Sequence, residues 1–271
     1  MTITKALIKW AGGKSKLLPT ILPELTGDRL IEPFVGSGVV FLNAPQKDII
    51  INDFNPDLTN LFKQVSLNYL RLVNATRKLF SQNTQADYTA LRLEFNSTNK
   101  TTLRRAALFI YLNRHCFNGL CRYNSSGGFN VPYGKYKTPY FPEEEILEIY
   151  RYIKELDFFY ILNKDFADVM KLAGSGDVVY CDPPYVPETA TSFTNYTGIG
   201  FSLKDQQRLV VEAEAARNRG AKVVISNLDT TVSRQLYQNA TSIIELQVQR
   251  SISASGSSDS RKKVSELIAL F

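Results

Sequence analysis

Asp182, Pro183, Pro184 and Tyr185 follow an apolar run that is typical of a buried strand. A carboxylate and a proline carbonyl both accept hydrogen bonds, and neither proline adds a competing backbone N–H donor. Such a pair could hold the two hydrogens of an exocyclic amine on a nucleobase and favour a tetrahedral, nucleophilic nitrogen. Tyr185 could stack on that base once it has left its duplex. The alternative is a loop that ends the strand, with a packed tyrosine.

A glycine turn and an acid predict a site for a nucleoside-containing cofactor. Residues 30–43 are interpreted as a strand, a Gly-x-Gly turn at Gly36 and Gly38, and a helix whose N-terminus a ligand could approach closely. Phe41 stands where the dinucleotide motif has its third glycine. Asp53 ends the next strand, where its carboxylate could accept hydrogen bonds from two ribose hydroxyls. The alternative is a plain tight turn and a helix-capping acid.

The N-terminal segment KWAGGKSKLL places Lys14 on a glycine turn. Gly13, Lys14 and Ser15 match the end of a phosphate-binding loop, but the first glycine of that motif would fall at Ile8. The motif is therefore incomplete. A lysine on such a turn suits an anionic group such as a carboxylate, and the alternative is a basic turn on the surface.

From Phe95 to Phe141 the chain contains no Asp or Glu, and we call this segment the acid-free window. Its seven Lys and Arg residues outnumber the net charge of +6, and ten aromatic residues lie among them. Arginine offers paired donors to guanine, and planar rings stack on bases or wedge between them. This pattern favours a nucleic-acid interface over a solvated helix face. The cations are Lys100, Arg104, Arg105, Arg114, Arg122, Lys135 and Lys137, and the aromatics include Phe117, Tyr123, Phe129, Tyr133 and Tyr136.

Apolar runs that alternate with helical periodicity predict the scaffold for these groups. The runs are rich in Val, Ile, Leu, Phe and Tyr and mostly lack strict alternation, which is typical of strands covered on both faces. Strand–helix–strand order predicts an α/β fold with a mainly parallel sheet of about seven strands. The expected strands are 29–34, 48–52, 157–162, 177–182, 222–227, 242–248 and 264–271.

Two helices are expected in the second half of the chain. Residues 202–220 begin with a serine N-cap and an aspartate at N3 and end at a glycine, and 229–240 form the second helix. The last two strands have no helix between them and predict an antiparallel pair. Their Ser/Gly-rich connection, 250–263, is expected to be mobile and ends in a second basic cluster, Arg261 to Lys263.

The alternation of strands and helices stops between residues 56 and 145. Helical patterns run together there and are followed by a segment rich in Gly, Asn, Pro and Tyr. We therefore expect a helical domain at 56–145, inserted into a catalytic domain formed by 1–55 and 146–271. The helical patterns cover 56–80, 84–95 and 101–114.

Composition narrows the class of protein. The chain has 271 residues, is 44% hydrophobic, and has no apolar run near the ~20 residues that span a bilayer. Its N-terminus carries no export signal. Three cysteines and the single His115 offer neither a disulfide framework nor a zinc site, so we expect no metal and a structural histidine. A cytoplasmic protein with reduced thiols, monomeric in solution, is expected.

Five motifs together resemble the Dam-type DNA adenine methyltransferases: KWAGGK, EPFVGSG, NGLCRYNSSGGFNVPYGKY, VVYCDPPY and RKKVSELIAL. The resemblance runs from about Ile8 to Phe271, and the order of the motifs also matches. It implies a Rossmann-like sheet of the S-adenosylmethionine-dependent methyltransferase type, with a helical target-recognition domain inserted after the strand of Asp53. It also implies methylation of adenine N6 in double-stranded DNA at GATC by base flipping, in a bacterium or a phage host cell.

The resemblance further implies a role for each matching residue. Lys14 would pair with the methionine carboxylate of S-adenosyl-L-methionine, and Asp53 would hold its ribose. Asp182, Pro183 and Tyr185 would be catalytic, with Asp182 also in the cofactor site. The other implied cofactor-binding residues are Trp10, Phe34, Gly36, Gly38, Asp165 and Phe166. The implied DNA-binding residues are Lys9, Phe117, Asn118, Leu120, Arg122, Pro132 and Tyr136.

Two positions depart from the family pattern. Phe117 stands where a tyrosine is expected, so a wedging ring remains without its hydroxyl, and Leu228 replaces a histidine after ISN. Three other functions remain open from the residues alone. They are an N4-cytosine methyltransferase, an RNA methyltransferase, and a non-catalytic DNA-binding protein on a degenerate enzyme fold.

Overall fold

A mixed sheet of seven strands in the order β3-β2-β1-β4-β5-β7-β6 forms the centre of the computed structural model, which describes residues 3–185, 201–249 and 263–271. Strands β1 to β5 run parallel, and β7 pairs antiparallel with both β5 and β6. The predicted α/β class and the antiparallel final pair are confirmed. The strands are β1 (Arg29–Glu32), β2 (Asp48–Asn52), β3 (Phe158–Leu162), β4 (Asp177–Cys181), β5 (Lys222–Leu228), β6 (Ser242–Gln249) and β7 (Lys263–Leu270).

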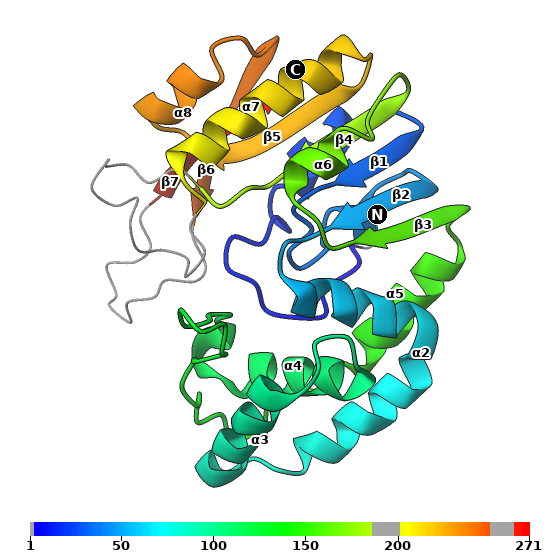
Figure 1. Ribbon diagram of the computed structural model, residues 1–271, viewed down its shortest axis with the longest axis vertical. Helices are drawn as coiled ribbons and strands as arrows, with labels where there is room; N and C mark the ends of the chain where they lie inside the picture. Colours follow the sequence, from blue (N-terminus) through cyan, green and yellow to red (C-terminus); the bar gives the residue numbers. More distant parts are fainter. Residues whose placement is uncertain (1–2, 186–200, 250–262) are drawn as a thin grey trace.

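Helices cover the sheet on both sides because alternate strand residues point to opposite faces. Ile49 and Ile51 belong to one buried cluster, whereas Ile50, between them, belongs to a second cluster with α6 and α7. Figure 1 shows α6 and α7 lying over the sheet and α2 to α5 gathered beyond its β3 side. The helices are α1 (Leu18–Ile21), α2 (Pro56–Phe80), α3 (Gln85–Ser97), α4 (Leu103–His115), α5 (Glu143–Lys154), α6 (Phe166–Met170), α7 (Leu203–Asn218) and α8 (Thr231–Leu236), with 3-10 turns η1 (Leu22–Glu24), η2 (Phe41–Asn43) and η3 (Phe117–Gly119).

Local sequence signals account for the ends of several helices. Helix α7 has the expected N-cap, since the Ser202 side chain accepts from the backbone of Asp205 and the Asp205 carboxylate accepts from that of Ser202. Asn55 caps α2 in a related way through the backbone N–H of Asp57. Helix α8 is shorter than the expected 229–240. Of the expected connection at 250–263, residues 250–262, with Arg261 and Lys262, lie outside the described residues, and Lys263 begins β7.

The helix expected after the Gly-x-Gly turn does not form, and this prediction is wrong. The chain makes only the 3-10 turn η2 before β2. Gly36 and Gly38 have positive φ angles of 50° and 78°, as a tight turn requires. A Cβ on Gly38 would lie 2.5 Å from the Phe41 ring and 2.7 Å from the Phe62 ring. Gly38 therefore makes room for packed core rings.

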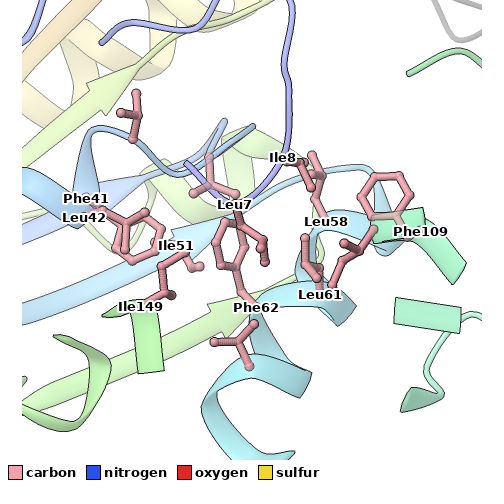
Figure 2. Close-up of a cluster of buried hydrophobic side chains, with 14 of the residues drawn as sticks. Leu7, Ile8, Phe41, Leu42, Ile51, Leu58, Leu61, Phe62, Phe109 and Ile149 are labelled. Carbon is pink, nitrogen blue, oxygen red and sulfur yellow. The ribbon is translucent and has the colours of Figure 1, made fainter. Parts of the chain in front are cut away.

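One buried cluster joins the sheet to the helices that lie between β2 and β3. Figure 2 shows Leu7 and Ile8 of the N-terminal segment, Ile51 of β2, Leu61 and Phe62 of α2 and, further along, Ile149 of α5 in this cluster. Helix α5 runs without a break across the expected domain boundary at 145/146. The position of the helices relative to the sheet is therefore set by shared apolar packing.

Candidate active site and nucleic-acid interface

The carboxyl ends of neighbouring parallel strands place the predicted site residues at one edge of the sheet. Asp53 follows β2, Asp182 follows β4, and Phe34 lies just beyond β1. These strands are adjacent in the order β2-β1-β4, so their ends lie side by side. This edge is where open parallel sheets bind their ligands.

Asp182 lies in a cluster of polar groups that come from three segments of the chain. Lys14 Nζ is 2.8 Å from Asp182 Oδ1, and the same ammonium lies 4.7 Å from the centre of the Tyr185 ring. Lys14 is buried and also donates to the carbonyl of Gly12 at 2.8 Å. The Tyr185 hydroxyl donates to Glu266 Oε2 at 2.8 Å. A compact set of an acid, a cation, an aromatic ring and a second acid results.

Glu266 is a member of this cluster to which the sequence analysis assigned no role, although it lies within the motif RKKVSELIAL. It is a buried acid on β7, 81 residues beyond Tyr185 in the sequence. A signal was present, because one carboxylate within the apolar run of a buried strand requires a polar partner. The identity of that partner depends on the pairing of β7 with β5, which no local pattern indicates.

Burial shifts the ionisation of the acids at this edge. Loss of water raises the pKa of Asp182 above its ordinary value, and the charge of Lys14 opposes that rise. Buried Glu32, at the end of β1, has its pKa raised well above the usual range, chiefly by burial, and accepts the backbone N–H of Phe41 at 3.1 Å. The Asp182 side chain keeps 23% exposure, so an incoming group can reach it.

Asp53 is held against the glycine turn. Its two carboxylate oxygens accept the backbone N–H groups of Gly36 at 3.0 Å and Asn55 at 2.9 Å. Burial raises the pKa of Asp53 to about 6. A Cβ on Gly36 would lie 3.0 Å from Trp10 Nε1, so the indole covers the turn. Trp10, Gly36 and Asp53 are thus brought together.

Aromatic rings gather beside Asp165, which caps α6. The centre of the Phe34 ring lies 5.3 Å from that of Phe166 and 5.6 Å from that of Phe201. Asp165 Oδ1 accepts from the Arg208 guanidinium at 2.8 Å, and the same guanidinium lies 4.9 Å from the Phe166 ring. Phe201 and Arg208 were not predicted, because neither lies in a motif.

These groups fit the three parts of an S-adenosylmethionine-type methyl donor. A buried ammonium at Lys14 suits a carboxylate, an acceptor at Asp53 suits a ribose diol, and the rings of Phe34 and Phe166 suit a flat base. Within the described ranges, no group of three or more His, Cys, Asp or Glu residues is arranged to hold a metal ion.

A second set of predicted residues comes together around Tyr136. Lys9 Nζ lies 4.6 Å from the centre of the Tyr136 ring, and the Tyr136 hydroxyl accepts the backbone N–H of Asn118 at 3.1 Å. Asn118 has a positive φ of 54°, which this backbone contact helps to hold. The backbone N–H of Phe117 donates to the carbonyl of Pro132 at 2.9 Å, and Phe117 is 40% exposed. The N-terminal segment therefore contributes Lys9 here and Lys14 to the Asp182 cluster.

Arg122 lies on a loop at 121–130. The loop folds back on itself, since Tyr123 and Phe129 form an antiparallel bridge. The exposed Arg122 guanidinium donates to the side-chain and main-chain oxygens of Asn130 at 2.8 Å and 3.2 Å. Leu120, just before the loop, is half-buried, and its carbonyl accepts from Cys116 Sγ.

The acid-free window is not one basic face, which corrects the sequence prediction. Arg105 is buried and paired with Asp57, and Arg104 pairs with Glu94, so acids outside the window neutralise two of its cations. Several aromatic residues of the window are core residues. Phe95, Phe109, Tyr111 and Phe129 are buried. The part of the window suited to DNA is the exposed portion beyond α4.

Known relatives assign the chain to a family. Residues 10–252 match the family described as D12 class N6 adenine-specific DNA methyltransferase. The DNA adenine methylase of Salmonella typhi is 46% identical over 100% of this chain and 96% of its own length, and that of Escherichia coli K12 is 44% identical with the same coverage. The DNA N-6-adenine-methyltransferase of Escherichia phage P1 is 46% identical over 93% of this chain, which spans only 34% of that protein. The chain therefore belongs to the D12 class N6 adenine-specific DNA methyltransferases.

Proposed function

We propose that this adenine-specific DNA methyltransferase uses S-adenosyl-L-methionine to methylate adenine N6 within GATC in double-stranded DNA. The observation that carries the proposal is the position of Asp182. It lies at the carboxyl edge of the sheet beside Lys14 and Tyr185, one strand away from the turn held by Asp53. The substrate amine and the methyl donor can therefore meet at this edge of the sheet.

The proposed chemistry uses two hydrogen-bond acceptors of the chain. The Asp182 carboxylate and the Pro183 carbonyl accept the two N–H groups of adenine N6, so the nitrogen lone pair is free to attack. The cofactor supplies a methyl group on a positively charged sulfur. The chain orients the reactants as the nitrogen–carbon bond forms and the carbon–sulfur bond breaks. The sulfur keeps the electron pair of the broken bond, and one proton passes from the methylated nitrogen to water. Positioning and electrostatics provide the acceleration.

The base must leave the duplex to reach these acceptors. Pro183 is buried and Asp182 is mostly shielded, so an adenine inside a base stack could not present its amine to both. Tyr185 would stack on the flipped adenine. Lys14 would hold the methionine carboxylate of the cofactor and Asp53 its ribose, and Phe34, Asp165 and Phe166 would hold its adenine.

The proposed DNA interface combines the Tyr136 set with Arg122. Lys9, Asn118, Leu120, Arg122, Pro132 and Tyr136 would read bases, and the exposed ring of Phe117 would wedge into the stack. We propose that the enzyme acts as a monomer on DNA in the bacterial cytoplasm. The bacterial and phage sources of its relatives support this location. No helix among the described residues is both long and apolar enough to cross a membrane.

Labelled S-adenosyl-L-methionine supplied with matched duplexes tests the proposal. We expect label on adenine N6 in a GATC duplex and little label when one base pair of that site is changed. Label on cytosine N4 would show an N4-cytosine methyltransferase, and a preference for RNA would show an RNA methyltransferase. Either result would contradict the proposed reaction. Failure to bind S-adenosyl-L-methionine would indicate a non-catalytic DNA-binding protein.

Asp182→Ala provides the residue-level test. It should abolish transfer while leaving DNA affinity largely intact, because Asp182 contacts the amine and not the phosphates. Asp168→Ala is the matched control, since Asp168 is an exposed acid on α6 whose recorded ion pair is with Lys171. Turnover close to that of the wild type in Asp182→Ala would refute the proposed acceptor role.

A further inference from the structure

Asp57, Arg105 and Tyr123 form a buried cluster beneath the 121–130 loop. The Arg105 guanidinium donates to both oxygens of Asp57, and the two side chains are only 3% and 2% exposed. The Tyr123 hydroxyl donates to Asp57 Oδ2 at 2.7 Å. The guanidinium also lies 3.8 Å from the centre of the Phe95 ring. Arg105 therefore holds both oxygens of Asp57, and Tyr123 adds a third hydrogen bond to one of them.

A fixed carboxylate makes a precise anchor for a tyrosine hydroxyl. Burial raises the pKa of Tyr123 well above its ordinary value, so the hydroxyl keeps its proton and remains a donor. Hydrogen bonds to charged groups are stronger and more directional than those between neutral groups. The bond joins residues 66 apart in the sequence, so it holds the loop to α2.

The direction of Tyr123 determines the direction of Arg122. Successive residues of an extended chain point to opposite sides, so the inward Tyr123 leaves Arg122 exposed. The bridge between Tyr123 and Phe129 and the bond from Arg122 Nε to Asn130 Oδ1 then hold the guanidinium on the outer side. A one-residue slip of the loop would exchange the two side chains.

The same anchor lies next to the proposed cofactor edge. The backbone N–H of Asn55 donates to Asp53 Oδ1 at 2.9 Å, and Asn55 Oδ1 accepts the backbone N–H of Asp57 at 2.9 Å. Asn55 Nδ2 is 3.5 Å from the Tyr123 hydroxyl. The loop that carries Arg122 is therefore tied to the turn that follows β2, beside Asp53.

We propose that Tyr123 is a specificity-determining positioning residue. Its hydroxyl holds the 121–130 loop in one register against Asp57, so that Arg122 meets its target base pair already oriented. This inference rests on the proposed function, because it requires base reading by Arg122. Tyr123 itself touches neither DNA nor cofactor. Its loss should therefore reduce sequence discrimination without weakening cofactor binding.

Tyr123→Phe tests this role because it keeps the ring and removes only the hydroxyl. We expect kcat/KM on a GATC duplex to fall about tenfold, as for a lost hydrogen bond to a charged group. On duplexes altered at the base pair read by Arg122, kcat/KM should fall much less. The discrimination ratio, which is kcat/KM on GATC divided by kcat/KM on the altered duplex, should therefore decrease. The dissociation constant of S-adenosyl-L-methionine, measured without DNA, should change by less than about twofold, because Tyr123 is proposed not to contact the cofactor.

Tyr111→Phe is the matched control. Tyr111 is a buried tyrosine of α4 in the same group of helices, and its hydroxyl donates to the carbonyl of Gln82 at 2.8 Å. Its discrimination ratio should equal that of the wild type. Rates are compared well below the unfolding temperature of each variant, so that a general loss of stability does not change the measured kcat/KM.

Two outcomes would overturn the positioning role. One is an unchanged discrimination ratio in Tyr123→Phe, and the other is an equal loss on every duplex. If the wild-type enzyme prefers a site other than GATC, that result contradicts the proposed recognition site but not the role of Tyr123. The discrimination ratio of Tyr123→Phe is then measured on the preferred site, so the two proposals are tested separately.

Discussion

Lys14 Nζ and Asp182 Oδ1 lie 2.8 Å apart, with Lys14 buried. The cation proposed for the cofactor carboxylate is thus paired with the acid proposed to accept the hydrogens of the substrate amine. Lys14 opposes the rise that burial causes in the pKa of Asp182. If both roles are correct, this pair links cofactor binding to the ionisation of Asp182.

Lys14→Met should move the acid limb of the pH profile of kcat to higher pH. Burial raises the pKa of Asp182 and the Lys14 ammonium lowers it, so removal of the ammonium should raise this pKa further. Asp182 holds the amine hydrogens only when ionised, so activity should be lost at a higher pH as the solution is acidified. The measurement is kcat against pH at saturating cofactor and DNA. Lys16→Met, at an exposed neighbouring lysine, should leave the limb in place.

S-adenosyl-L-methionine should bind more weakly as the pH falls through about 6, because burial raises the pKa of Asp53 to about 6. The ribose hydroxyls donate best to the ionised carboxylate, so affinity is present above this pH and declines below it. Calorimetric titration from pH 7.5 to pH 5 measures the effect, about one unit either side of the transition. Asp53→Asn should bind weakly with little pH dependence, whereas Asp48→Asn, at the other end of β2, should behave as the wild type. A pH-independent affinity in the wild type would contradict this role of Asp53.

Glu266 should influence turnover through Tyr185. Tyr185→Phe and Glu266→Leu each remove one partner of the same 2.8 Å hydrogen bond. Each should lower kcat by about tenfold, and the double variant should lose little more, because coupled residues are not additive. Glu266→Gln keeps an acceptor and should retain most of the activity. Additive losses in the double variant would show that the two residues act independently.

Arg105→Met should destabilise the fold far more than Arg104→Met. The substitution of Arg105 leaves the buried Asp57 carboxylate without its cation, which typically costs about 3–5 kcal/mol of folding free energy. Arg104 and Glu94 are 44% and 38% exposed, and such surface pairs contribute about 0–1 kcal/mol. Urea unfolding of both variants measures the difference. Equal free energies of unfolding would contradict the importance of the buried pair.

The strands and the strand-end acids could be predicted from the sequence because they depend on local patterns. The expected strands agree with the observed ones to within two residues at their ends. Parallel pairing then places residues such as Asp53 and Asp182 at one edge whatever the details of packing. The helix expected after Gly38 is only the 3-10 turn η2, and the buried rings of Phe41 and Phe62 pack beside that glycine.

The acid-free window shows most clearly what local sequence cannot decide. Its cations look alike in the sequence, yet Arg105 is buried against Asp57, 48 residues away, while Arg122 is exposed. Tyr185 and Glu266 likewise meet across 81 residues.

By itself, the sequence determined the class of fold, the edge of the sheet at which we propose the chemistry and the residue types available there. Tertiary structure alone decided which charges are neutralised and which side chains remain free for a ligand. The physical reason is that a buried charge must find its counter-charge or hydrogen-bond partner in space, and such partners come from distant segments that only the folded chain brings together.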